Sequence, residues 1–272
     1  MDMDIHTLDQ ILLQQNGRII HQVWFGTIPN RFSARKTYKK LKRYRESWKI
    51  KNPTWFHIEW NKKICFDFMK TFYNEHLSMF SKYKFEIQRC DSIRYFILHR
   101  YGGIYADMDY YCCKPFDTVF EEYKKKLYLV ETPNSVNEMI SNSLMFSSPN
   151  HPFWKNVFLE LQLNQNSARL YSKHLHVMCS VGPLFLNRVF AKYKYKYNLG
   201  SFPKEKFQPY DIHQSKISLD DTDAYAIHVS QGAWHSRDTR IINIIRSEWY
   251  IFLFIFFILA IPFFVYRKKK QK

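Results

Sequence analysis

Glycine and proline are scarce in this sequence, with 7 and 10 residues among 272. Disordered chains are usually rich in such residues and poor in apolar ones, whereas this chain is 46% hydrophobic and 18% aromatic. It can therefore bury enough apolar surface to fold. Its length suits one sizeable domain rather than several.

Cysteine is also scarce. The five cysteines are an odd number and stand in no metal-binding pattern. Cys112 and Cys113 are adjacent, and adjacent cysteines rarely bridge to each other without strain. A disulfide framework is therefore not expected. A bridge from one of this pair to Cys65, Cys90 or Cys179 is the minor alternative.

The N-terminus lacks an apolar segment that could drive export of a large domain. Near the C-terminus, Trp249 to Tyr266 is a run of eighteen residues without a charge and with aromatic residues at both ends. We predict a transmembrane helix over 247–266, a basic tail over 267–272 and a folded domain over 1–246. A buried core helix is the alternative for the apolar run.

The tail bears on the membrane topology. Its basic residues favour the cytosol, which would place the domain in the lumen. Its last four residues, 269–272, resemble a dilysine retrieval signal, so we expect a single-pass membrane protein of the endoplasmic reticulum or Golgi. The missing leader favours instead a tail anchor with a cytosolic domain, and both orientations stay open.

Acidic residues are the minority charge, with 24 Asp and Glu against 41 Lys and Arg, and the formal net charge is +17. Such a balance suits an anionic partner: nucleic acid, an acidic membrane surface or a substrate that carries phosphates. Solubility combined with a lysine-rich coding bias is an equally good explanation of the charge alone.

Strand and helix patterns alternate along residues 1–246. Apolar or alternating runs predict strands over 19–24, 54–60, 104–109, 127–130, 144–146 and 224–229. Helical periodicity predicts helices over 33–49, 61–80 and 85–101. This order predicts an α/β fold with a mostly parallel sheet and helices on both faces, in which ligands bind beyond the carboxyl ends of strands.

Asp107 and Asp109 lie at such a strand end, where side-chain alternation would place both on one face about 7 Å apart. Carboxylates are ligands for Mn²⁺ or Mg²⁺, which commonly take one or two of them together with substrate phosphates. We therefore expect these two residues to form a catalytic centre with such a cation. A D-x-D sequence is frequent by chance, so its context matters.

The context consists of Asp91, Arg94 and the pair Gly102-Gly103. Asp91 and Arg94 share one helical face, where an acid can accept hydrogen bonds from sugar hydroxyls and a guanidinium can hold a phosphate or sugar oxygen. An ordinary ion pair within the helix is the alternative. The glycines end the helix and also allow the backbone to approach a ligand closely.

Several motifs in series resemble a known family. They are 19–26 (IIHQVWFG), the block 91–109, 142–146 (NSLMF) followed by 150–153 (NHPF), 181–183 (VGP), and 226–228 (AIH) with Trp234 behind it. Together they resemble the D-x-D glycosyltransferases that include inositol phosphoceramide mannosyltransferases and fungal α-1,6-mannosyltransferases. The likeness to α-1,4-galactosyltransferases and clostridial glucosylating toxins is more distant.

The resemblance implies a glycosyltransferase type-A fold, which is Rossmann-like, and a metal-dependent, retaining transfer of a hexose from a nucleotide sugar. It implies Asp109 and His228 as metal ligands, with His235 as the other candidate. A histidine in an apolar strand is more often structural than a ligand, so a structural role is the alternative for His228. The donor-binding residues it implies are Trp24, Asp91, Arg94, Gly103, Tyr105, Asp107, Asn142 and Trp234.

Mannose from GDP-mannose is the favoured donor, and a lipid such as inositol phosphoceramide is the favoured acceptor. A UDP-hexose-dependent transferase acting on a glycan or protein is the alternative. Charge and aromatic content also suggest a nucleic-acid-binding or nucleotidyl-transfer protein. The basic residues are dispersed, however, and form no recognised module, so we expect no nucleic-acid partner. An inactive tail-anchored adaptor is disfavoured because competent residues fill the metal and sugar positions.

Overall fold

A computed structural model describes residues 4–26, 32–123, 126–133, 139–164, 172–210, 217–219 and 223–229, with the backbone alone for 32–38. The chain divides into two compact units, of which the first comprises 1–169 and 176–231 and contains nearly all of these residues. The second comprises 170–175 and 232–272. The predicted transmembrane segment 247–266 and the tail lie outside the described residues, within which no helix is long and apolar enough to cross a bilayer.

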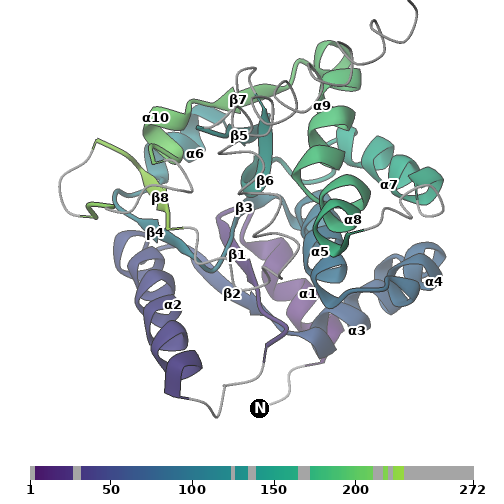
Figure 1. Ribbon diagram of the computed structural model, residues 1–272, viewed down its shortest axis with the longest axis horizontal. Helices are drawn as coiled ribbons and strands as arrows, with labels where there is room; N and C mark the ends of the chain where they lie inside the picture. The colour runs from purple at the N-terminus through teal and green to yellow at the C-terminus, as the bar shows by residue number, and fades with distance from the viewer. Residues whose placement is uncertain are drawn as a thin grey trace, which may run out of the picture. The chain divides into compact units, whose positions relative to one another are not determined.

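A six-stranded sheet runs through the first unit in the order β2-β1-β3-β6-β5-β7 (Figure 1). The strands are β1 (Ile19–Val23), β2 (Phe56–Trp60), β3 (Gly103–Ala106), β5 (Leu127–Glu131), β6 (Ile140–Ser147) and β7 (Gly200–Phe202). Pairs β1–β2, β1–β3 and β5–β7 are parallel, whereas β6 is antiparallel to both of its neighbours. The sheet is therefore mostly parallel, as predicted, with β6 alone reversed.

A second sheet contains two antiparallel strands, β4 (Tyr110–Cys112) and β8 (Ala226–His228). Strand β4 begins directly after the D-x-D sequence, and β8 comes from the end of the described chain. This small sheet therefore joins two distant parts of the sequence beside the predicted site.

Helices cover both faces of the large sheet. They are α1 (Ile5–Gln14), α2 (Phe32–Lys51), α3 (Lys62–Phe72), α4 (Asn74–Lys82), α5 (Glu86–Tyr101), α6 (Asp117–Tyr123), α7 (Phe153–Asn164), α8 (Lys173–Ser180), α9 (Pro183–Tyr197) and α10 (Lys204–Phe207). Every residue of β1, β3 and β6 is buried. Helices on both faces bury the side chains of successive residues alike. Among the buried polar residues of these strands, His21 and Asn142 form hydrogen bonds within the protein.

The two faces have separate apolar clusters. On one face, Trp48 of α2, Phe120 of α6 and Phe207 of α10 pack with strand residues such as Ile104 and Phe146. Figure 1 shows these three helices on the same side of the sheet.

On the other face, Phe96 of α5 and Phe158 of α7 stack with ring centroids 4.1 Å apart, and Trp154 of α7 donates to Ser147 Oγ of β6 over 2.8 Å. All five cysteines of the chain are free thiols, so no disulfide contributes to the fold.

Two predicted elements differ from those observed. The predicted helix 61–80 is divided into α3 and α4 at Tyr73, which has non-helical φ and ψ of −142° and 43°. The Tyr73 hydroxyl lies 2.6 Å from His99 Nδ1, and its ring packs on Phe96 and Phe158. These contacts with α5 and α7 stabilise a break that local periodicity does not reveal. The predicted strand 104–109 also ends early, at Ala106.

Candidate active site

The turn that carries the two carboxylates begins where β3 ends. Asp107, Met108 and Asp109 do not continue the strand, because Tyr110 N donates to Asp107 O over 3.0 Å and closes a turn. Asp107 N donates in addition to Ser143 O of β6 over 2.8 Å. The alternation of an extended strand is therefore not what brings the carboxylates together, and that part of the prediction was wrong.

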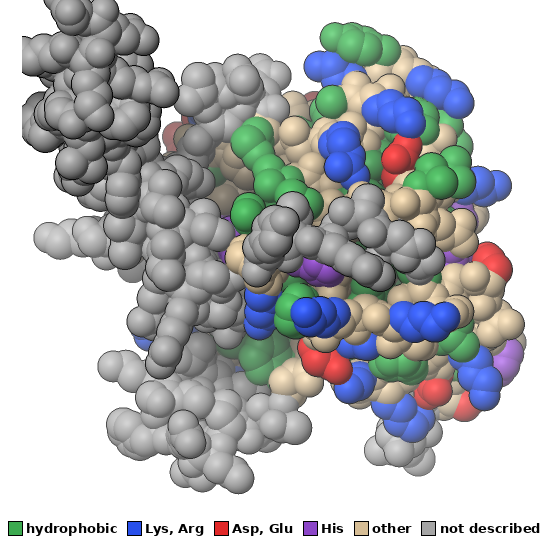
Figure 2. Space-filling view, turned by 45° about the vertical axis from the view of Figure 1, so that its right-hand side comes forward, with side chains coloured by type: hydrophobic (Ala, Val, Ile, Leu, Met, Phe, Trp, Pro, Cys, Tyr) green, Lys and Arg blue, Asp and Glu red, His purple; other side chains and the backbone are tan. Residues whose placement is uncertain are grey.

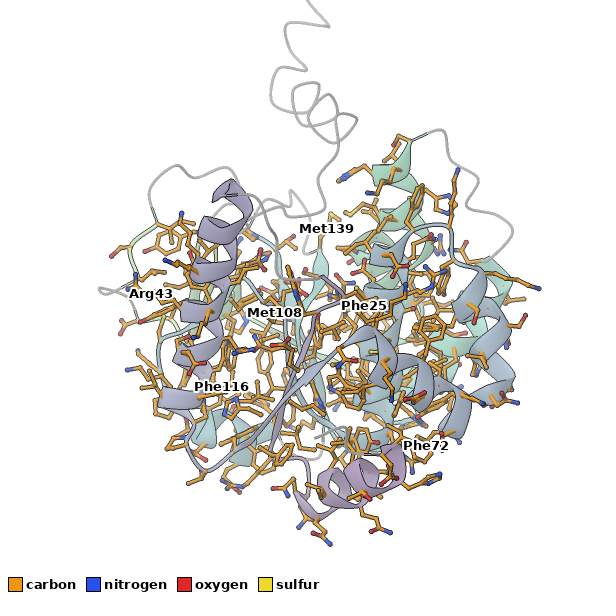
Figure 3. The ribbon with its side chains drawn as sticks, turned by 90° about the horizontal axis from the view of Figure 1, so that it is seen from below. Phe25, Arg43, Phe72, Met108, Phe116 and Met139 are labelled. Atoms are coloured by element: carbon orange, nitrogen blue, oxygen red, sulfur yellow. The ribbon has the colours of Figure 1, made fainter. Side chains whose placement is uncertain are left out.

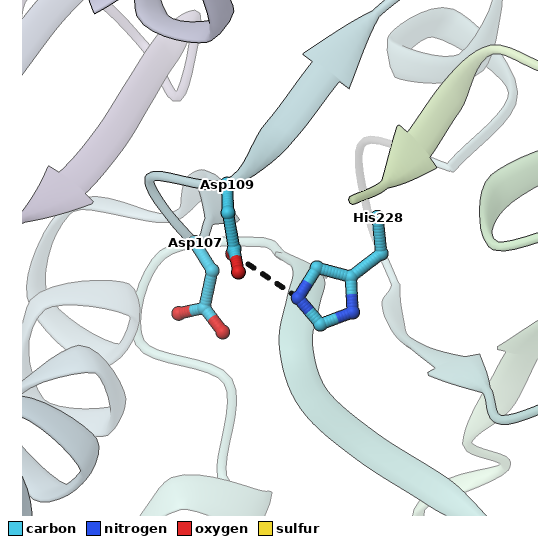
Figure 4. Close-up of side chains that lie close together, drawn as sticks. All are labelled: Asp107, Asp109 and His228. Carbon is cyan, nitrogen blue, oxygen red and sulfur yellow. Dashed lines mark hydrogen bonds and ion pairs between the residues drawn. The ribbon is translucent and has the colours of Figure 1, made fainter. Parts of the chain in front are cut away.

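His228 reaches this turn from 119 residues further along the chain. Strand β8 pairs with β4 so that His228 lies opposite Tyr110, and the two rings stack with centroids 4.6 Å apart. Val229 N donates to Asp109 O over 2.9 Å, and His228 Nε2 lies 3.1 Å from Asp109 Oδ1 (Figure 4). The structure thus brings one predicted metal ligand to the other. His235, the alternative ligand, lies outside the described residues.

Asp107, Asp109 and His228 fit a divalent cation. Their ligand atoms all lie within 4.8 Å of one another, and an ion that holds its ligands at about 2.1 Å places opposite ligands about 4.2 Å apart. The side chains are 27%, 17% and 15% exposed, so one side of the group remains open to a substrate. Two carboxylates and an imidazole form a donor set suited to Mn²⁺ and compatible with Mg²⁺.

The charges at this centre depend on one another. Burial raises the pKa of Asp107, and the guanidinium of Arg94 offsets part of that rise. Burial by itself would lower the pKa of His228, but the carboxylates of Asp109 and Asp107 outweigh burial and shift it upward. In the absence of a cation, the imidazole therefore compensates part of the negative charge of the two acids.

Arg94 is buried, with 3% of its surface exposed, and contacts Asp91 and Asp107. Its NH2 donates to Asp91 Oδ1 over 2.5 Å, and its NH1 lies 3.1 Å from Asp107 Oδ1 and 2.8 Å from Asn142 O. Its Nε donates to Cys90 O over 3.1 Å. Since the guanidinium already has protein acceptors, the structure favours Arg94 as a support of Asp107. Its predicted direct hold on the donor receives no support from this placement.

Asp91 lies on the far side of the same guanidinium. Burial raises the pKa of Asp91 to about 7, although Arg94 acts to lower it. A methyl group at Gly182 would come within 3.3 Å of Asp91 Oδ2 and within 3.1 Å of Val177 O. The glycine of the V-G-P motif therefore allows close packing of the start of α9 against this carboxyl.

Tyr105 and Asn142 are both buried members of the predicted donor set. The Tyr105 hydroxyl donates to Asp107 Oδ1 over 2.7 Å, and its ring lies 4.5 Å from the Arg94 guanidinium carbon. Asn142 Nδ2 donates to the Tyr95 hydroxyl over 3.1 Å. Tyr105 therefore contacts Asp107 directly, whereas Asn142 is linked to it through its backbone oxygen, which accepts from Arg94 over 2.8 Å.

Gly103 lies at the opposite end of β3 from Asp107. It has a φ of +89°, and a Cβ there would lie 2.5 Å from Ile19 O in β1. The residue thus permits two backbones to approach within the sheet. Its predicted role beside the donor is not supported by this position, because β3 extends about 10 Å between Gly103 and Ala106.

The predicted donor set contains two tryptophans, Trp24 and Trp234. Trp24 follows β1, is half-buried, and donates its backbone N–H to Trp60 O over 2.9 Å. Figure 3 shows its neighbour Phe25 together with Met108, the central residue of the D-x-D turn, between α2 and the helices of the opposite face. Trp234 lies outside the described residues.

Three residues next to the carboxylates were missed by the sequence analysis: Tyr110, Ser143 and Gln208. Tyr110 stacks on His228, and its hydroxyl lies 3.2 Å from Ser143 Oγ and 3.1 Å from Gln208 Oε1. Ser143 belongs to the motif 142–146 and so had a sequence signal. Gln208 has none, because it directly follows α10 and lies outside every motif.

Comparison with known proteins relates the region around this site to one family. Residues 39–126 match the family described as a glycosyltransferase sugar-binding region containing a DXD motif, and this range includes Asp107 and Asp109. Over this range the chain is similar to the DXD glycosyltransferases. An inositol phosphoceramide mannosyltransferase of Schizosaccharomyces pombe is 29% identical over 266 residues, which cover 96% of this chain and 76% of that protein.

Other relatives of this chain differ in length. A mannosyl phosphorylinositol ceramide synthase of Saccharomyces cerevisiae is 31% identical over 72% of this chain, which spans 49% of that protein. An uncharacterised glycosyltransferase of Acanthamoeba polyphaga mimivirus is 28% identical over 79% of this chain and 82% of its own length. The UDP-bound glycosyltransferase domain from the YGT toxin superposes with a TM-score of 0.49 and 11% identity, over 68% of this chain and 79% of that one.

Proposed function

We propose that this protein is a metal-dependent, retaining hexosyltransferase of type-A fold that transfers mannose from GDP-mannose to a lipid-linked acceptor such as inositol phosphoceramide. The observation that carries the proposal is the convergence of Asp107, Asp109 and His228, whose ligand atoms lie within 4.8 Å of one another. A bound Mn²⁺ or Mg²⁺ would neutralise charge on the departing diphosphate, which is the main electrostatic demand of the reaction.

The protein residues have defined parts in this proposal. Asp109 and His228 would hold the cation, and Asp107 would bind the donor ribose or reach the cation through water. Arg94 and Tyr105 hold the Asp107 carboxylate in one orientation through contacts of 3.1 and 2.7 Å. Positioning of this kind limits the reorganisation needed when the charged donor binds.

The choice of mannose is supported by the relatives. Those with assigned names include mannosyltransferases acting on inositol phosphoceramide. A UDP-hexose is the alternative donor, and a glycan or protein is the alternative acceptor, since specificity in such folds depends on variable loops around the site.

The lipid acceptor is supported by charge beside the site. Helix α2 exposes Lys39, Lys40, Lys42 and Arg43, and none of these forms an ion pair with the part of the chain that the structure describes. The guanidinium of Arg43 lies over the ring of Tyr111, 6.0 Å from the ring centroid. Tyr111 is two residues after Asp109 in the sequence. An anionic, phosphate-bearing acceptor suits such a helix.

We also propose that the chain is a single-pass membrane protein of the endoplasmic reticulum or Golgi, because of the apolar segment predicted over 247–266.

The proposal is tested by measuring the nucleotide that the purified full chain, in detergent, releases from a panel of GDP- and UDP-sugars with and without Mn²⁺. Metal-dependent release of GDP from GDP-mannose is expected, and its rate should rise when inositol phosphoceramide is added. Release from a UDP-hexose alone would select the alternative donor. A folded protein that binds Mn²⁺ but turns over no sugar nucleotide would overturn the enzymatic proposal.

A further inference from the structure

Gln22 of β1 has a buried amide that the surrounding protein does not satisfy. Only 3% of the residue's surface is exposed, and its Nε2 has no hydrogen-bond partner among the residues that the structure describes. Buried polar groups in folded proteins nearly always have such a partner, because leaving one unpaired costs free energy. Gln22 also belongs to the sequence motif 19–26, in which it has no assigned role so far.

The register of the sheet places this amide near the D-x-D turn. Ile20 of β1 lies opposite Ile104 of β3. Two residues further along this parallel pair, Gln22 lies beside Ala106, which directly precedes Asp107. Because side chains alternate along a strand, Gln22 is on the same face as Ile20, which belongs to the apolar cluster between the sheet and α2.

The strand order makes this end of the sheet a crevice suited to a ligand. In the order β2-β1-β3, the chain passes from β1 to β2 on one side of β1 and then crosses to β3 on its other side. In open α/β sheets, ligands bind outside the carboxyl ends of the strands at the point where the order reverses, which here lies between β1 and β3. Gln22 and Asp107 therefore belong to the two strand ends that border this crevice.

A nucleotide sugar in this crevice has parts with different requirements. Its diphosphate needs the cation, which the proposed function assigns to Asp109 and His228. Its nucleobase is flat and can stack on aromatic side chains such as Trp24 and Phe25, which follow β1 and are partly exposed. The edge of a base carries hydrogen-bond donors and acceptors, and an amide offers one group of each kind. The amide of Gln22 therefore matches the base better than it matches the diphosphate.

We propose that Gln22 is a specificity-determining residue that forms hydrogen bonds with the nucleobase of the donor, and that its amide is unpaired in the ligand-free protein for this reason. The inference rests on the proposed nucleotide-sugar donor and goes beyond it, because it assigns the recognition of the base to one residue. Such a contact discriminates between bases, since a base without matching groups leaves the buried amide unpaired.

The direct test is the Kd of GDP and of UDP for the full chain in detergent with Mn²⁺, measured by calorimetry. Gln22→Met, which keeps the length of the side chain but has no amide, should bind the preferred nucleotide about tenfold or more weakly than the wild type. The Kd of pyrophosphate with Mn²⁺ should be unchanged, because pyrophosphate has no base. Gln22→Leu should show the same pattern and keeps the inference testable if Gln22→Met does not fold.

Gln88 of α5 is a matched control for stability. It is 1% exposed, but its Nε2 donates to Ser180 Oγ over 2.9 Å and its Oε1 accepts from Phe85 N over 3.0 Å. Gln88→Met should lower the melting temperature of the nucleotide-free protein, because it leaves both partners unpaired. Gln22→Met should leave the melting temperature unchanged or raise it, because it removes a group that has no partner.

The outcomes separate this inference from the proposed function. Equal affinity of the wild type and Gln22→Met for the preferred nucleotide would overturn the inference, and so would equal weakening of nucleotide and pyrophosphate binding. A loss of melting temperature in Gln22→Met as large as that in Gln88→Met would also overturn it, since the amide would then be paired within the folded protein. If the wild type binds pyrophosphate but neither GDP nor UDP, the nucleotide-sugar donor of the proposed function fails as well.

Discussion

At the scale of single residues, Asp109 is the ligand on which the proposed activity depends most directly. We expect Asp109→Ala to lower kcat/KM roughly 100-fold or more, because a cation at a developing negative charge contributes several kcal/mol to transition-state stabilisation. Thermal unfolding should change little, since the side chain is partly exposed. Asp67→Ala, which removes an exposed carboxylate paired with Lys63 at 3.0 Å, is the control and should keep full activity.

Arg94 is a different kind of residue, because its main effect should be on folding. Arg94→Ala leaves the buried carboxylates of Asp91 and Asp107 without their partner, and removing one member of a buried ion pair typically costs about 3–5 kcal/mol. Urea denaturation of the wild type and the variant measures this loss. Lys63→Ala, which breaks an exposed ion pair within a helix, should cost only about 0.3 kcal/mol. A stable Arg94→Ala protein with weakened donor binding would instead support the direct donor contact.

At the scale of elements, His21 of β1 forms hydrogen bonds to the end of α5 and to β2. The His21 ring is fully buried, its Nε2 lies 2.9 Å from Gly102 O at the end of α5, and its Nδ1 accepts from the Trp60 indole of β2 over 3.2 Å. Indole N–H is only a donor, so Nδ1 must be unprotonated and the ring neutral. Burial lowers the pKa of His21 to about 3, against an ordinary value of 6.5.

This depressed pKa predicts a pH-dependent stability. Below pH 6.5 the unfolded chain binds a proton at His21 that the folded chain does not, so stability falls by about 1.4 kcal/mol per pH unit until the folded pKa near 3 is reached. The contribution is fully present above pH 6.5. His21→Gln should be less stable at pH 7.5 but should lack this slope. Equal slopes for both proteins between pH 6 and 4, measured by urea denaturation, would contradict the assignment.

The elements also show how far local sequence signals extend. Apolar or alternating runs correctly predicted β1, β2, β5 and the second half of β6, and helical periodicity with the Gly102-Gly103 stop predicted α5. Helix α1 was not predicted, although Asp4 caps it by accepting from His6 N and Thr7 N. Asp9 of this helix pairs with Arg100 of α5 at 2.6 Å, which is a tertiary contact without a local signature.

At the scale of the whole molecule, the net charge of +17 is unevenly placed with respect to the site. Figure 2 shows the side that carries α7 and α9, on which lysines and arginines are dispersed among hydrophobic and polar side chains. The basic residues of α2, by contrast, lie beside β4, the strand that follows Asp109. Helix α2 is held against this strand by Trp48, whose Nε1 donates to Tyr110 O over 3.0 Å. Among the described residues, this second group is the one beside the candidate site.

A charge-reversal experiment distinguishes the two groups. Lys39→Glu, Lys42→Glu and Arg43→Glu together should raise the KM for an anionic lipid acceptor about tenfold or more, at roughly 1 kcal/mol per basic residue near a charged surface. Donor hydrolysis without acceptor should be unchanged. The matched control reverses Arg188, Lys194 and Lys196 on α9, which is the same change in net charge. Equal effects of the two triple variants would show that only overall charge matters.

The sequence by itself determined most of the strands, three of the helical regions, the similarity to DXD glycosyltransferases and the place of Asp107 and Asp109 after a strand, because apolar periodicity and the Asp91–Asp109 block are local patterns. It also supplied His228 through its place in the motif series. The reversal of β6, the turn at Asp107, the burial of Arg94 and the contact of Gln208 with His228 were decided only by tertiary structure. Each of these depends on groups far apart in the chain, whose pairing is set by packing that buries apolar area and satisfies buried polar atoms together.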